Sequence, residues 1–68
     1  MKTITLSIPN IHCHHCLMTI QREIKAIPGI EFVRGDVEHK TATFRITDDE
    51  ALTRLKAILT EVGYPAAD

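Results

Sequence analysis

The sequence contains few aromatic residues and almost no net charge, and each shortage excludes a class of function. Its 68 residues include two Phe, one Tyr and no Trp, so the core must be aliphatic and a deep aromatic pocket for an organic substrate is not expected. Eight Lys and Arg residues face nine Asp and Glu residues, which gives a net charge of −1. Since no segment forms a basic stripe, nucleic acid is not the expected partner.

Long hydrophobic runs are also absent. No run approaches the ~20 apolar residues of a membrane-spanning helix, so we expect no membrane insertion. Residues 1–5 lack the apolar stretch and the cleavage site of a signal peptide, and we therefore expect a cytoplasmic protein. Residues 1–68 are expected to form a single domain with a modest core. The initiating Met and the short tail favour a free protein over a domain of a transporter.

Both cysteines lie in one short stretch. Residues 11–16 read Ile-His-Cys-His-His-Cys and hold three of the four histidines as well. Glutathione keeps cytosolic thiols reduced, and a disulfide between Cys13 and Cys16 would close too small a ring to stabilise the fold. A Cys-x-x-Cys pair at the start of a helix binds a soft metal, exchanges thiols and disulfides, or supplies half of a zinc site.

Hydrophobic periodicity predicts a strand before this motif and a helix after it. Residues 2–9 alternate between apolar and polar side chains, which predicts a half-buried strand ending at a proline. A helix is expected to begin near residues 14–16 and to continue up to the stop signal Pro28-Gly29. Its apolar stripe falls at intervals of three and four residues, at Leu17, Ile20, Ile24 and Ile27.

The middle of the chain predicts a hairpin. Residues 30–37 form the second expected strand, in which Val33 and Val37 fall at even spacing and Gly35 marks a bulge or a close packing contact. The polar turn of residues 38–40 leads into a third strand over residues 41–47, whose inward side chains are Ala42, Phe44 and Ile46. Because so short a polar turn joins the two strands, they should pair as a hairpin.

A second helix and a short strand complete the expected order. Thr47 and Glu50 fit a capping box at the start of the helix, and Asp48 is the alternative cap. The apolar stripe consists of Leu52, Leu55, Ile58 or Leu59, and Val62, and Gly63 is the stop signal. Residues 64–67 are just long enough for a closing strand, which Pro65 restricts to the edge of the sheet.

This order of elements predicts an α+β fold. The pattern β-α-β-β-α-β is that of a ferredoxin-like sandwich, in which two helices cover one face of a four-stranded antiparallel sheet. In this topology the loop after the first strand, the hairpin turn and the loop after the second helix lie at the same end. Cys13, Cys16, His39 and Tyr64 therefore belong to one end of the domain.

The expected positions of the two cysteines favour metal binding. Cys16 falls in the first turn of the first helix, where unpaired amides and the helix dipole should lower its pKa. Cys13 lies in the preceding loop, from which its sulfur can approach a metal from another side. Two thiolates with few other ligands suit Cu(I), whereas Zn(II) requires four ligands and would need a histidine, a water or a second molecule.

Together these features resemble a known family. The order of elements, the Cys-x-x-Cys loop, Pro28-Gly29 and Gly63-Tyr64 resemble the heavy-metal-associated domain of small copper chaperones, and the resemblance spans the whole chain. The same domain forms metal-binding modules of copper-transporting P-type ATPases. The resemblance implies a carrier, not an enzyme, that binds Cu(I) through Cys13 and Cys16. It also implies delivery to the metal-binding domain of such an ATPase, by exchange of one thiolate ligand at a time.

The resemblance assigns roles to two further residues. Tyr64 lies in the loop that shields the metal in bacterial members of the family. Ile11 occupies a position that is usually Met, whose side chain is a buried hydrophobic anchor beneath the loop rather than a ligand. Ile can fill that role with some loss of adaptability.

The histidines of the motif leave other metals open. Imidazole binds Zn(II), Cu(II) and Ni(II) as well as Cu(I), so the two cysteines and a loop histidine could form a Zn(II) carrier or a broader heavy-metal carrier. A zinc-transporting relative would be expected to use His12, which precedes the first cysteine. His14 is the alternative ligand, and His15 is expected to turn away along the helix.

Several other roles also stay open. His39 is expected to be a turn residue rather than a ligand, and Met18 belongs either to a partner-docking patch or to the packing. Two Cys-x-x-Cys loops face to face would supply four sulfurs, which allows a metal-bridged homodimer. The motif alone also allows a thiol–disulfide oxidoreductase. Against that alternative, the chain lacks the larger α/β fold and the aromatic-Cys-Gly-Pro-Cys loop of thioredoxin-like enzymes.

Overall fold

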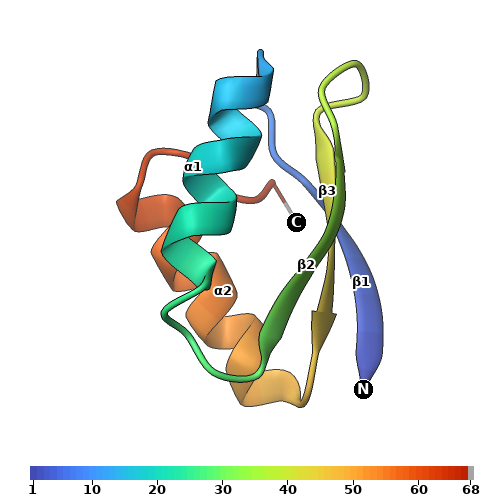
Figure 1. The fold of residues 1–68 in the computed structure, drawn as a ribbon, viewed down its shortest axis with the longest axis vertical. Coiled ribbons are helices and arrows are strands. Elements are labelled where there is room, and N and C mark those ends of the chain that lie inside the picture. Colours follow the sequence, from blue (N-terminus) through green and yellow to red (C-terminus); the bar gives the residue numbers. More distant parts are fainter. Residues whose placement is uncertain (68) are drawn as a thin grey trace.

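The computed structural model describes residues 1–67, which form three strands and two helices. In chain order these are β1 (Lys2–Ser7), α1 (His14–Ile24), β2 (Ile30–Asp36), β3 (Thr41–Ile46) and α2 (Asp49–Glu61). The strands make one antiparallel sheet in the order β1-β3-β2, and both helices lie on one side of it (Figure 1). The predicted α+β class is confirmed, and each strand ends one or two residues earlier than predicted.

The fourth strand predicted at residues 64–67 is not formed. This segment follows α2 and returns to β1, where the backbone N–H of Ala67 donates to the carbonyl oxygen of Ser7 at 2.8 Å. Pro65 has no N–H with which to continue a ladder, so the segment lies beside β1 as irregular chain. Within residues 1–67 the sheet therefore has three strands rather than four.

Strand β2 departs from regular pairing near its middle. Its register with β3 shifts between Phe32 and Arg34, and Val33 at this bulge is 41% exposed instead of facing the core with Val37. The close contact expected at Gly35 is present, because a Cβ atom there would come within 2.5 Å of Leu17 Cδ2. The bulge itself therefore lies two residues before the glycine that signalled it.

The core is aliphatic, as the composition requires. Its fully buried side chains come from the loop after β1, from both helices and from β3. They are Ile8, Ile11, Cys16, Ile20, Phe44, Ile46, Leu55 and Leu59. Phe44 meets the half-buried Phe32 edge to face, with ring centroids 5.7 Å apart. Because Ile11 and Cys16 belong to this set, the Cys-x-x-Cys motif is anchored in the core.

Helix α1 ends earlier than predicted. Its last residue is Ile24, and the N–H of Ile27 donates to the Ile24 carbonyl at 3.0 Å in the turn that follows. Pro28 disfavours helical backbone at Ile27, and Gly29 reverses the chain with a φ of 87°. The helix therefore ends about one turn before Pro28-Gly29 rather than directly at it. Neither described helix has the length and hydrophobicity to cross a lipid bilayer.

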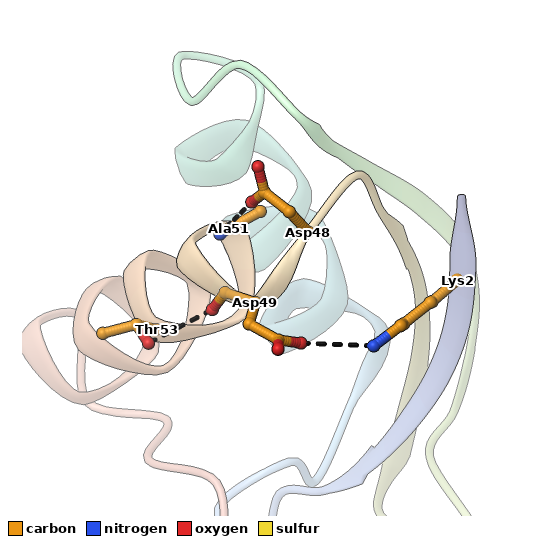
Figure 2. A network of polar contacts seen from close by, with 5 residues as sticks. All are labelled: Lys2, Asp48, Asp49, Ala51 and Thr53. Atoms are coloured by element: carbon orange, nitrogen blue, oxygen red, sulfur yellow. Dashed lines mark hydrogen bonds and ion pairs between the residues drawn. The ribbon is translucent and has the colours of Figure 1, made fainter.

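Helix α2 is capped by Asp48, the alternative to Thr47. Asp48 Oδ1 accepts a hydrogen bond from the N–H of Ala51 at 2.9 Å (Figure 2). Glu50, the expected partner of Thr47 in a capping box, instead pairs with Arg54 at 3.6 Å, one turn along the helix. Asp48 therefore caps the start of α2 in the way predicted for Thr47, one residue further along the chain.

The first residue of α2 also connects the helix to the sheet. Asp49 forms an ion pair with Lys2 at 3.3 Å, and its carbonyl oxygen accepts the hydroxyl of Thr53 at 3.2 Å (Figure 2). Both charged groups are largely exposed, so this pair contributes little to stability. It lies at the end of the molecule opposite to the start of α1 (Figure 1).

Candidate metal centre

The Cys-x-x-Cys motif begins in the segment of residues 8–13, which is called the metal-binding loop below because it carries the candidate ligands His12 and Cys13. Ile11 at its centre is fully buried, and its N–H donates to the carbonyl oxygen of Ile8 at 3.0 Å. This turn directs the chain from β1 into α1 and brings Cys13 to the N-cap position of the helix. Ile11 thus has the burial expected of an anchor beneath the loop.

Cys13 stands where a helix usually has Ser, Thr, Asp or Asn. Its backbone is extended, and its side chain makes no capping hydrogen bond. The first turn of α1 also has no acidic residue. The helix therefore forgoes the roughly 1 kcal/mol that a capping oxygen contributes. A sulfur at this position is explained by chemistry rather than by helix stability.

The two sulfurs lie side by side at different depths. Cys13 Sγ and Cys16 Sγ are 3.8 Å apart, and both cysteines are free. Cys16 is 1% exposed, whereas Cys13 is half-buried at the surface. The motif thus combines one sulfur fixed in the core with one that an incoming group can reach.

The surroundings of Cys16 favour its thiolate. Burial raises the pKa of this thiol. Four hydrogen bonds lower it by a larger amount: from the Tyr64 side chain, from the backbone N–H groups of His12 and Cys13, and from the Cys13 thiol. The resulting pKa of Cys16 is about 7, against an ordinary value of 9.0. The sequence predicted a lowered pKa from unpaired amides and the helix dipole; backbone N–H groups do contribute, but the Tyr64 side chain lowers the pKa of Cys16 most.

His12 completes a group of three candidate ligands. The ligand atoms of His12, Cys13 and Cys16 all lie within 4.8 Å of one another. His12 Nδ1 is 3.6 Å from Cys16 Sγ and 3.0 Å from the carbonyl oxygen of Asn10, to which it donates when it carries a proton. Binding a metal through Nδ1 would break this bond, while binding through Nε2 would allow the ring to keep it.

The other histidines lie outside this group, and residues 1–67 contain no second group of three such ligands. His14 and His15 are exposed at the start of α1. His39 is exposed in the β2–β3 turn, where its Nδ1 lies 2.7 Å from Asp36 Oδ2 and lowers the pKa of that carboxyl. The geometry therefore favours His12 over His14 as a third ligand.

The distances within the group can be compared with the needs of different ions. Two thiolates on a tetrahedral ion with metal–sulfur bonds of about 2.3 Å lie about 3.8 Å apart, as the two sulfurs do here. A linear two-coordinate ion with bonds of similar length would need about 4.6 Å between them. Binding such an ion requires Cys13 to move outward, because Cys16 is held in the core.

Tyr64 reaches the site from the far end of the chain. Its N–H donates to the carbonyl oxygen of Leu59 at 2.8 Å, which fixes the loop after α2. The pKa of its phenol is raised, first by interaction with the sulfur of Cys16 and then by burial. Tyr64 thus belongs to the same end of the domain as the two cysteines.

Two residues at the site were missed in the sequence. Lys40 Nζ donates to the carbonyl oxygen of Ile11 at 2.8 Å, and Asn10 Nδ2 donates to the carbonyl oxygen of Gly63 at 2.9 Å. Both contacts join the metal-binding loop to segments far away in the chain. A lysine in a polar turn and an asparagine after a proline read as ordinary surface residues, so no local pattern could have identified them.

Comparison with known proteins gives a consistent family. Residues 5–65 match the family described as heavy-metal-associated domain. The mercuric transport protein periplasmic component of Pseudomonas aeruginosa is 32% identical over 69 residues, which cover 97% of this chain and 74% of that protein.

Solved structures with the same fold agree with this match. Oxidised MerP from Ralstonia metallidurans CH34 superposes with a TM-score of 0.80 at 28% identity, over 97% of this chain and 93% of MerP. The CopZ metallochaperone superposes with a TM-score of 0.82 at 18% identity, over 97% of this chain and all of CopZ, which shows a shared fold. The arrangement of these elements is therefore the ferredoxin-like one that the sequence predicted.

Proposed function

Because the chain belongs to the heavy-metal-associated domain family, we propose that it binds one soft metal ion between Cys13 and Cys16 and carries it to another protein. The observation that carries this proposal is a pair of sulfurs 3.8 Å apart, of which the buried one has its pKa lowered to about 7. Near neutral pH a large fraction of Cys16 is already thiolate, the form that soft ions bind. The protein is a carrier in this proposal, not an enzyme, and should show no turnover in an insulin-reduction assay.

The proposed cargo is Cu(I). This ion accepts low coordination numbers, so two sulfurs from one chain are sufficient, and thiolates select it among the common biological ions. Hg(II) has the same preference for sulfur, and the P. aeruginosa relative is named a mercuric transport protein. The site should therefore also accept Hg(II) when it is offered, and the cargo depends on which soft ion the cell supplies.

The difference in depth between the two sulfurs supports delivery by ligand exchange. An incoming thiolate would bond to the ion from the side of the half-buried Cys13 and displace that thiolate, while Cys16 in the core still holds the ion. The proposed recipient is the metal-binding domain of a copper-transporting P-type ATPase. Met18, two residues after Cys16, is 52% exposed and available for contact with such a partner.

The cysteines provide the test of this proposal. Cys13→Ser and Cys16→Ser should each lose tight Cu(I) binding in competition with a strong Cu(I) chelator, because a serine hydroxyl is a hard ligand. His15→Ala is the matched control, since His15 is exposed and lies outside the ligand group. Retention of tight Cu(I) binding by the double cysteine variant would show that the proposal is wrong.

A second candidate cargo is Zn(II), or a broader range of metals, with His12 as third ligand. The sulfur separation of 3.8 Å and the 3.6 Å between His12 Nδ1 and Cys16 Sγ both suit a tetrahedral ion. A water or a second molecule would supply the fourth ligand. Two loops face to face would give a metal-bridged homodimer, which size-exclusion chromatography with and without metal would detect.

We also propose a cytoplasmic location, where glutathione would keep the cysteine pair reduced and ready for metal. The P. aeruginosa relative is named a periplasmic component, so the compartment needs a direct test. Trapping of free thiols with an alkylating agent in intact cells should label both Cys13 and Cys16. A disulfide between them in freshly trapped protein would place the chain in an oxidising compartment instead.

A further inference from the structure

Lys40, in the turn between β2 and β3, holds the metal-binding loop at two points. Its Nζ donates to the carbonyl oxygen of Ile11 at 2.8 Å. Its own carbonyl oxygen accepts the N–H of Ile8 at 2.7 Å. One residue therefore fixes the first position of the loop through its main chain and the centre of the loop through its side chain.

The turn is built so that Lys40 can make both contacts. Asp36 Oδ1 accepts the N–H of His39 at 3.1 Å, and Asp36 Oδ2 lies 2.7 Å from the ring Nδ1 of the same histidine. Lys40 follows directly after these two contacts between Asp36 and His39. Its φ is 56°, a left-handed conformation that is unfavourable for residues other than glycine. Glycine would fit this backbone better, but it would lack the amine that reaches the Ile11 carbonyl.

The contact with Ile11 matters because the two cysteines are held differently. Cys16 is fixed by helix α1 and by the core, in which it is 1% exposed. Cys13 follows Ile11 by two residues, and its carbonyl oxygen accepts the N–H of Cys16 at 3.1 Å. Its side chain makes no capping bond, so the direction of its sulfur depends on the path of the loop. A hydrogen bond from an ammonium group to the Ile11 carbonyl is charge-assisted, and it restrains that path.

We propose that Lys40 is a positioning residue of the metal centre, which shapes the metal-binding loop before metal arrives. This inference rests on the proposed function, because it concerns the same two sulfurs. A loop that is already ordered loses less conformational entropy when metal binds, so the complex is tighter than it would be with a mobile loop. Lys40 does not contact the metal in this account; it acts through Ile11.

The test uses variants that separate the side chain from the backbone of the turn. Lys40→Gly keeps a residue that adopts a φ of 56° without strain, and so preserves the turn and the main-chain bond to Ile8 while removing the amine. Lys40→Arg retains a charged donor of similar reach. Lys2→Ala is the control for loss of one positive charge, because Lys2 pairs with Asp49 at the opposite end of the molecule.

The first readout is amide hydrogen exchange in the reduced, metal-free protein. The Ile11 amide, bonded to the Ile8 carbonyl, reports directly on the loop. Lys40→Gly should speed exchange at this amide by roughly three- to tenfold, the effect of losing one partly solvated charged hydrogen bond. Lys40→Arg and Lys2→Ala should exchange like the wild type. If the Ile11 amide of the Lys40→Gly protein exchanged at the same rate as in the wild type, the proposal would be overturned.

The second readout is the Cu(I) affinity of the same variants in competition with a chelator. Lys40→Gly should bind Cu(I) more weakly by a similar factor, and Lys40→Arg should recover the loss. If Lys40→Gly showed faster exchange at Ile11 but bound Cu(I) as tightly as the wild type, the proposal would be overturned. Faster exchange throughout the core would overturn it as well, since Lys40 would then be a general structural residue. If the wild type itself fails to bind Cu(I), the proposed function fails, while the exchange result still decides whether Lys40 orders the loop.

Discussion

The side chain of Tyr64, in the loop after α2, acts on the sulfur of Cys16 in the first turn of α1 and lowers the pKa of that thiol. This contact comes first among those that favour the thiolate, and together they outweigh the burial that raises the pKa of Cys16. A residue near the end of the chain thus prepares the ligand that lies in the core.

Replacing this tyrosine should therefore raise the pKa of Cys16. In the metal-free Cys13→Ser protein, the thiolate absorbance of Cys16 near 240 nm should titrate below 9.0 but above about 7, because the Cys13 thiol that helps to lower the pKa of Cys16 is gone. Adding Tyr64→Phe should move the midpoint further upward, toward 9.0. The double variant Cys13→Ser/Cys16→Ser, which has no thiol, is the control and should show no thiolate transition. Equal midpoints with and without the hydroxyl would contradict the role given to Tyr64.

Stability should depend on pH through the same group. A thiol whose pKa is lower in the folded protein than in the unfolded chain stabilises the fold fully above the unfolded value, here near 9.0, and loses this contribution as pH falls toward about 7. Urea unfolding of the reduced, metal-free protein should therefore show a gain in stability between pH 7 and pH 9 that Cys16→Ala lacks. Parallel profiles for the two proteins would argue against a stabilised thiolate.

The histidines should separate in zinc binding. His12→Ala should weaken Zn(II) binding by about tenfold or more, since loss of a ligand or of its orienting partner has effects of that order. His14→Ala should leave Zn(II) affinity unchanged, because His14 lies outside the ligand group. Chelator competition with Zn(II) measures both variants. A larger loss in His14→Ala would mean that the loop rearranges around the metal.

Gly35 should not tolerate a side chain. A Cβ atom at this position would lie 2.5 Å from Leu17 Cδ2 and 2.6 Å from Cδ1, so Gly35→Ala must displace a leucine that is 6% exposed. Overpacking of this kind costs about 1–3 kcal/mol of unfolding free energy, measurable by urea denaturation. The smaller side chain of Leu17→Ala should remove much of this penalty in the double variant. If the losses of unfolding free energy in Gly35→Ala and Leu17→Ala simply added up in the double variant, the contact with Leu17 would not be the cause of the destabilisation.

Local patterns were sufficient for most of the fold. The alternation in β1 and the apolar stripes of both helices arise because one face of each element packs on the core, and such periodicity can be read from the sequence. The polar turn after β2 likewise marked the hairpin. Errors arose where a bulge or a proline interrupted the regular pairing of the sheet. Val33 turned outward at a bulge, and Pro65 left residues 64–67 beside β1 without a strand.

The candidate site divides in the same way. Cys13 and Cys16 stand out by spacing, and their placement at the start of a helix follows from the stripe after them. The preference for His12 over His14 depends on the direction of each side chain, which periodicity does not give. Lys40 could not be predicted at all, because its contact with Ile11 spans 29 residues and requires a left-handed backbone at a lysine.

The central claim is that two thiolates make this chain a Cu(I) carrier, and one titration tests it most directly. The fully reduced protein is titrated against a strong Cu(I) chelator, with Zn(II) competition run in parallel under the same conditions. We predict that Cu(I) is held far more tightly than Zn(II), at one ion per monomer or shared across a dimer. Equal competition by Zn(II) would contradict the claim and assign the histidine-rich loop to zinc or to broader metal handling.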